Sequence, residues 1–126
     1  MITNQNPNDA GKPAVDFEQL RAASGDDNDL LNDLVNLYFG QAKDIITSLR
    51  AALDKKISGD VDYLSHKLVG ASLACGMTAM VAPLRELEGR GRKGDLTGAE
   101  EFMTQAVANL ELVRSAVEEY LRTGPS

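Results

Sequence analysis

Between residues 27 and 57, the apolar side chains of this chain recur at intervals of three and four positions. This spacing places them along one side of an α-helix, whereas a strand would alternate apolar and polar residues. The apolar positions are Leu30, Leu31, Leu34, Leu37, Tyr38, Ile45, Ile46, Leu49, Leu53 and Ile57. No stretch of the sequence shows the strand pattern. The chain is therefore predicted to be all-α.

The same spacing recurs in the rest of the chain and predicts further helices. The predicted ranges are residues 17–23, 27–57, 60–76, 78–88 and 98–122. Asp16, Asp26 or Asp27, and Asp60 are candidate N-caps. Pro83 disfavours a straight helix over the whole fourth range, because proline is tolerated only in the first turn of a helix. This helix therefore either begins after Thr78 or bends. The glycine-rich basic segment 89–94 is predicted to be a turn.

Four substantial amphipathic helices with short connections favour antiparallel neighbours. The predicted fold is an antiparallel up-down four-helix bundle with a short extra N-terminal helix. A chain of 126 residues is long enough for one hydrophobic core. Residues 1–14 are polar and predicted to form a disordered leader, residues 15–122 the bundle, and residues 123–126 a frayed tail.

Composition excludes several classes of function. Thirteen basic residues against 19 acidic ones give a formal charge of −6, which disfavours a nucleic-acid partner. No apolar run is long enough to span a membrane, and the N-terminus is too polar for a signal peptide. One histidine and one cysteine exclude the usual zinc sites, so no metal site is expected. A single cysteine cannot form an internal disulfide, which fits the cytoplasm.

The only histidine, His66, is predicted to face solvent. At about 100° per residue, a helix over residues 60–76 places an apolar stripe on one side and His66 within roughly 20° of the opposite pole. The stripe consists of Val61, Leu64, Leu68, Ala71 and Cys75. Because a histidine that is only structural is usually buried and hydrogen-bonded, this position favours a functional role.

The residues predicted to surround His66 suggest a docking surface. Asp62 lies one turn before it, Val69 and Gly70 one turn after it, and Leu73 two turns after it. Gly70 removes a side chain that would obstruct access, and the two apolar residues gain nothing from facing water. We interpret this pattern as a nucleophile on a surface that contacts a partner.

The run from Ser65 to Ser72, SHKLVGAS, is followed by Gly76 and by LRELE at residues 84–88. These motifs resemble the histidine phosphotransfer (HPt) domain family, whose members typically carry His-x-Leu-Lys-Gly-x-Ser. The pattern from Val15 through residues 25–27 to Leu31 is also similar to that family. The resemblance extends over residues 15–121.

The resemblance implies a phosphocarrier of a two-component phosphorelay. His66 would accept a phosphoryl group from an aspartyl phosphate of a response-regulator receiver domain and pass it to another receiver aspartate. A hybrid sensor histidine kinase is a further expected partner. The protein would need no cofactor, because the receiver brings Mg²⁺ and the positioning groups. We expect a monomer, not an enzyme in its own right.

The sequence departs from the family pattern three residues after the histidine, where Val69 replaces the usual lysine. Lys67 points about 100° away from His66, although its long stem could reach part of the way. Arg85 or Arg90, or the basic residues that follow, could supply the missing positive charge if the fold brings them near. Lys67 is also counted among the expected docking residues.

Two classes of function remain open. The first is the phosphotransfer module, and the second is a degenerate bundle that docks receiver or kinase domains without carrying phosphate, which the valine at position 69 favours. A conventional enzyme ranks third, since Ser65 and Ser72 point away from His66 and no third group that could orient the imidazole is evident. An initiating methionine favours a free-standing protein over a piece of a hybrid kinase.

Overall fold

The computed structural model describes residues 13–123, which contain five α-helices, one short 3₁₀-helix and no strand. The elements are α1 Phe17–Ser24, α2 Asn28–Lys55, α3 Ser58–Cys75, η2 Thr78–Met80, α4 Val81–Lys93 and α5 Ala99–Thr123. The predicted all-α class is confirmed. Most of the predicted leader and tail lies outside the described residues, and those two predictions stand as predictions. Within the described part, the carbonyl oxygens of Pro13 and Ala14 accept hydrogen bonds from Thr78 Oγ1.

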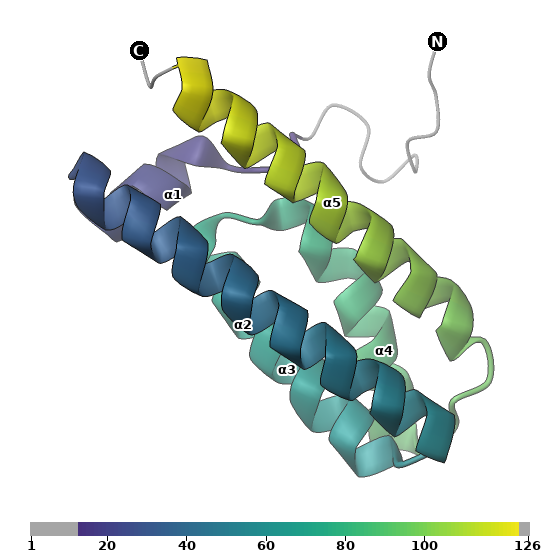
Figure 1. The fold of residues 1–126 in the computed structure, drawn as a ribbon. Coiled ribbons are helices and arrows are strands. Elements are labelled where there is room, and N and C mark those ends of the chain that lie inside the picture. The colour runs from purple at the N-terminus through teal and green to yellow at the C-terminus, as the bar shows by residue number, and fades with distance from the viewer. Residues whose placement is uncertain (1–12, 124–126) are drawn as a thin grey trace, which may run out of the picture.

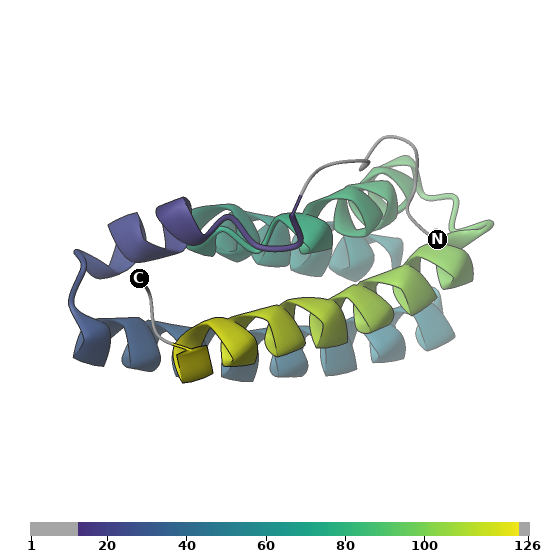
Figure 2. The same ribbon diagram turned by 90° about the horizontal axis from the view of Figure 1, so that it is seen from above.

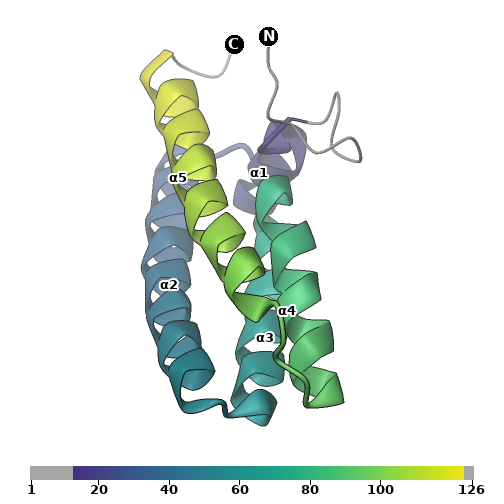
Figure 3. The same ribbon diagram turned by 90° about the vertical axis from the view of Figure 1, so that its right-hand side faces the viewer.

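The four longer helices surround one core, and helices that follow each other along the chain run in opposite directions (Figure 1). Each helix packs against its neighbours in sequence, and α2 also contacts α5, which closes the ring. Seen from two other sides, α2 and α5 form one layer, and α1, α3 and α4 form the other (Figures 2 and 3). The short α1 occupies the end of the second layer beyond the start of α4, where α2 and α5 extend further (Figure 3).

The core is largely aliphatic and includes one buried polar contact between helices. The hydroxyl group of Tyr38 on α2 lies 2.7 Å from Ser72 Oγ on α3. Burial raises the pKa of Tyr38 to about 12, so its proton is retained at physiological pH. At the α1 end of the bundle, Phe17 stacks on Tyr120 of α5 with ring centroids 4.1 Å apart. No helix of residues 13–123 has the length and hydropathy to cross a membrane.

The caps predicted for the first two helices are confirmed, but the one predicted for α3 is wrong. The Asp16 side chain accepts a hydrogen bond from the Gln19 amide, and the Asp27 side chain accepts from the amides of residues 29 and 30. The third helix begins at Ser58 rather than at Asp60, and no side chain caps it. Lys56, with a left-handed φ of 58°, ends α2 and turns the chain directly into α3.

The prediction that segment 89–94 is a turn is wrong, because residues 89–93 belong to α4. After the 3₁₀ turn η2, α4 begins at Val81, so Pro83 lies in its first turn as proline prefers. The helix then continues to Lys93 and ends at Gly94, whose φ of 73° is left-handed. Its last turn is basic, which complements the negative end of the helix dipole.

Tertiary packing explains why α4 tolerates glycine within this segment. A Cβ atom placed on Gly91 would lie 2.5 Å from the Asp62 amide nitrogen and 2.8 Å from the Ser58 carbonyl oxygen. No side chain fits between the two backbones at this point. The contact brings α4 against the first half of α3 and offsets the cost of a glycine inside a helix, about 1 kcal/mol relative to alanine.

We expect Gly91→Ala to lower the free energy of unfolding by about 1–3 kcal/mol, because the new methyl group forces the α3 and α4 backbones apart. Gly89→Ala is the matched control on the same helix, since a Cβ atom there meets nothing within 4 Å. That change should stabilise the protein by up to about 1 kcal/mol. Urea unfolding of both variants measures the difference, and equal effects would contradict the close contact at Gly91.

Candidate functional site

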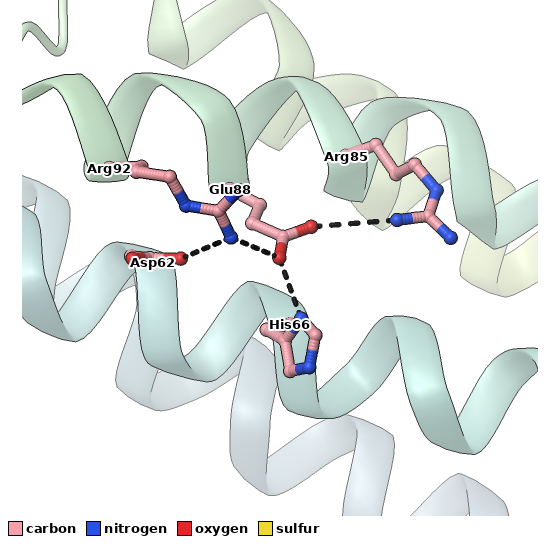
Figure 4. A network of polar contacts seen from close by, with 5 residues as sticks. All are labelled: Asp62, His66, Arg85, Glu88 and Arg92. Atoms are coloured by element: carbon pink, nitrogen blue, oxygen red, sulfur yellow. Dashed lines mark hydrogen bonds and ion pairs between the residues drawn. The ribbon is translucent and has the colours of Figure 1, made fainter.

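His66 lies on α3 at its boundary with α4, and its side chain is 71% exposed. The prediction that this histidine faces solvent agrees with that position. The imidazole is not free to rotate, however, because one nitrogen is held from α4. His66 Nδ1 lies 2.6 Å from Glu88 Oε2 (Figure 4). Glu88 itself is buried, with its side chain only 7% exposed.

The hydrogen bond to Glu88 determines which nitrogen of the neutral imidazole is the nucleophile. An ionised carboxylate can only accept hydrogen bonds, so the hydrogen in this contact belongs to Nδ1 of His66. In neutral imidazole the other nitrogen, Nε2, then carries the lone pair. No group among residues 13–123 makes a hydrogen bond to Nε2. When the ring is neutral, the arrangement therefore presents Nε2 and its lone pair to solvent in a fixed orientation.

Glu88 is kept ionised by positive groups on its own helix and by His66. Burial alone would raise the pKa of Glu88, but three other effects outweigh it: the hydrogen bond from His66, the charge that the His66 ring has when it is protonated, and the charges of Arg92 and Arg85. The pKa of Glu88 consequently lies below its usual value of 4.5. Arg92 Nη2 donates to Glu88 Oε2 at 2.9 Å, and Arg85 Nη1 lies 3.7 Å from Oε1.

Asp62 connects this network back to α3. Its carboxylate lies 3.5 Å from Arg92 Nη2, on the turn of α3 that precedes His66 (Figure 4). Arg92 thus lies between two carboxylates, one from each helix, and its position is fixed by both. The contribution of Asp62 is to orient Arg92 rather than to contact His66.

Of the other residues predicted to surround His66, Gly70 and Leu73 are exposed and Val69 is not. The Leu73 side chain is 50% exposed, and a Cβ atom on Gly70 would meet nothing within 4 Å. Val69 is only 3% exposed, so the prediction that it contacts a partner is wrong. The predicted apolar stripe left Val69 out, whereas α3 packs against both α2 and α4 and buries a wider face that includes Val69.

The basic residues considered for charge support separate into three positions. Arg85 lies beside Glu88, as described above. Arg90 points elsewhere: its guanidinium donates to the Thr97 carbonyl oxygen and lies 4.5 Å from the centre of the Phe102 ring. Lys67 is exposed, with its ammonium 6.0 Å from the centre of the Tyr63 ring. Of the basic residues considered on α4, the structure therefore brings Arg85 and Arg92 to the site but not Arg90.

The role of Glu88 was not predicted from the sequence, although this residue belongs to the LRELE motif at residues 84–88. Because the predicted helix ended at residue 88, Glu88 and Arg92 were not expected to lie one turn apart on the same helix. A helix continued to Lys93 would have placed these two residues and Arg85 on one side of α4, as an acid between two bases. Glu88 is thus a group that orients the imidazole, which was not evident from the sequence.

No metal site accompanies this network. Within residues 13–123, no three histidine, cysteine or acidic side chains come together in a way that could hold a metal ion. The polar groups around His66 are one ionised carboxylate and two guanidinium groups. They can hold a proton on Nδ1 and bind an anion, and they supply no second nucleophile.

Comparisons with known proteins place the chain in a family. The family model described as "Hpt domain" matches residues 33–121, and the chain therefore belongs to the Hpt domain family. The crystal structure of histidine-containing phosphotransfer protein B (HptB) from Pseudomonas aeruginosa PAO1 superposes with a TM-score of 0.80. That match covers 86% of this chain and 95% of the HptB chain at 22% sequence identity, which establishes the shared fold. Among curated proteins no sequence match was found.

The lowered pKa of Glu88 makes part of the stability depend on pH. A carboxylate whose pKa is lower in the folded state stabilises the fold above its unfolded value, and this contribution is lost as pH falls through the folded value. We expect the wild-type free energy of unfolding to decline below pH 4.5, the usual value for this group, more steeply than that of Glu88→Gln. Urea unfolding across this pH range measures both slopes, and parallel slopes would contradict the ionised Glu88.

Proposed function

We propose that this protein relays phosphoryl groups between aspartates of response-regulator receiver domains through Nε2 of His66. Membership of the Hpt domain family indicates a histidine phosphotransfer role in phosphorelays. The observation that carries the proposal is the exposed His66 whose Nδ1 is hydrogen-bonded to the buried, ionised Glu88. This contact leaves Nε2 with a lone pair and in reach of a partner protein.

In the proposed transfer, the Nε2 lone pair of His66 attacks the phosphorus of an aspartyl phosphate on the receiver. The N–P bond forms as the P–O bond to the aspartate breaks, and the receiver carboxylate leaves with its electron pair. The hydrogen on Nδ1 does not move, so the phosphorylated ring carries a positive charge. Glu88 lies 2.6 Å from Nδ1 and stabilises this charge. In the reverse direction, a receiver aspartate attacks phosphorus and the ring returns to neutral.

The receiver supplies the remaining chemistry in this proposal. Mg²⁺ and the groups that position the phosphoryl oxygens belong to the receiver, so the bundle acts as a phosphocarrier rather than an independent catalyst. Exposure suits this role, since the nucleophile has to enter the partner's site. The surface around His66 that would contact the receiver includes Gly70, Leu73 and Lys67, with Asp62 at its edge beneath Arg92. A hybrid sensor histidine kinase could deliver phosphate through a receiver domain of its own.

The second candidate is a bundle that docks receiver or kinase domains without carrying phosphate. The absence of the usual lysine at position 69 favours it, because that residue would balance phosphoryl charge. The His66–Glu88 contact favours the carrier, since a pure docking protein has no need of a fixed imidazole tautomer.

Phosphoryl transfer from a phosphorylated receiver domain tests the proposal directly. Wild-type protein should acquire label that is acid-labile and alkali-stable, and His66→Ala should acquire none. Binding of both proteins to the receiver is measured in parallel as the control. Label absent from wild type with several receivers, while binding persists, would overturn the carrier and leave the docking protein.

Gly70 tests whether the receiver approaches over α3. A Cβ atom there meets nothing within 4 Å, so Gly70→Ala should stabilise the fold by up to about 1 kcal/mol while slowing transfer several-fold. Gly40→Ala, at an exposed and equally open position inside α2, should stabilise the fold similarly without slowing transfer. Unfolding curves and transfer rates for both variants provide the comparison. Equal transfer rates in the two variants would contradict approach over Gly70.

A further inference from the structure

Arg85 and Arg92 both contact Glu88, but they are held very differently. Arg92 donates at 2.9 Å to Glu88 and also lies 3.5 Å from Asp62. Arg85 has a single contact of 3.7 Å with Glu88, which is too long for a hydrogen bond. Arg85 is therefore a loosely held cation that contacts the same carboxyl group as His66, that of Glu88 (Figure 4).

The pairing of α3 with α4 determines which part of α3 Arg85 faces. The two helices are antiparallel. Arg92 on α4 pairs with Asp62 on α3, and Glu88, one turn earlier on α4, pairs with His66, one turn later on α3. The next step places Arg85 level with residues 69 and 70. Val69 is buried there and Gly70 has no side chain, so α3 leaves open the space into which the Arg85 guanidinium can extend.

A phosphoryl group on Nε2 would need a positive partner in that space. It brings about two negative charges at neutral pH. The nearest base on α3, Lys67, lies over Tyr63 and projects about 100° away from His66 around the helix. Arg92 is already bound by two carboxylates. Arg85 remains as the cation that can move toward the phosphoryl oxygens.

We propose that Arg85 binds the phosphoryl group carried by His66, and so supplies from α4 the positive charge that α3 lacks at Val69. This inference rests on the proposed phosphocarrier function. Phosphorylation makes the His66 ring cationic, so the ring replaces Arg85 as a positive neighbour of Glu88. The guanidinium is thereby released to the phosphoryl oxygens, while Arg92 stays bound to Glu88 and Asp62.

The test compares Arg85→Gln and Arg85→Lys with Lys93→Gln, a control that removes the same charge from an exposed position at the end of the same helix. Each protein is phosphorylated by a receiver domain, and the transfer rate and the ³¹P chemical shift of the phosphohistidine are measured. Arg85→Gln should slow transfer about tenfold, the effect of one hydrogen bond to a charged group, and should move the ³¹P resonance. Arg85→Lys should recover part of the rate, and Lys93→Gln should match the wild type.

The outcomes separate this inference from the proposed function. If wild type and Arg85→Gln are labelled at equal rates with the same ³¹P shift, Arg85 has no role and the phosphocarrier stands. If Lys93→Gln slows transfer as much as Arg85→Gln does, the effect is general electrostatic attraction and the specific contact is overturned. If wild type takes no label from any receiver, the proposed function and this inference both fail.

Discussion

The close approach of α4 to α3 at Gly91 is the constraint on which the geometry of the site depends. With the Gly91 backbone against Ser58 and Asp62, the two helices are aligned so that Glu88 meets His66 one turn away. A side chain at position 91 would increase the separation, and a carboxyl group buried without its donors would be costly. Gly91 therefore influences the site by setting the separation of the α3 and α4 backbones and not by contacting the imidazole.

The remaining helices hold this pair without taking part in the polar network. The hydroxyl group of Tyr38 joins α2 to the buried side of α3 at Ser72. The helix α5 lies beside α2, in the layer opposite α3 and α4. Because α4 is shorter than α2 and α5, α1 fills the end of its layer and stacks Phe17 on Tyr120. Among residues 13–123, no helix covers the outer sides of α3 and α4 around His66, whose side chain is 71% exposed. The proposed transfer requires this exposure, because His66 would enter the partner's site.

Helical spacing alone was enough to predict the fold class and the exposure of His66, because both depend on periodicity within one helix. Glu88 and Val69 could not be placed in this way. Whether Glu88 reaches the histidine depends on the alignment of α3 and α4, which the close backbone contact at Gly91 determines. Val69 is buried because α3 packs against both α2 and α4, and a projection of α3 alone does not include these contacts. The segment 89–94 was mistaken for a turn because glycine is a poor helix former in isolation. Its packing against α3 reverses that preference.

Charge balance explains why so few groups could suffice for reversible transfer. Before transfer, the carboxylates of Glu88 and Asp62 are matched by the guanidinium groups of Arg85 and Arg92. Under the proposed mechanism the cationic ring lies against Glu88 and the phosphoryl group against Arg85, so each newly charged group has a group of opposite charge beside it. Neither state then leaves an unpaired charge at the buried end of the network, where it would be most costly. Under this mechanism the groups that stabilise one state also stabilise the other, which would keep the free-energy difference between the two states small. A carrier that both accepts and donates phosphate requires such a small difference.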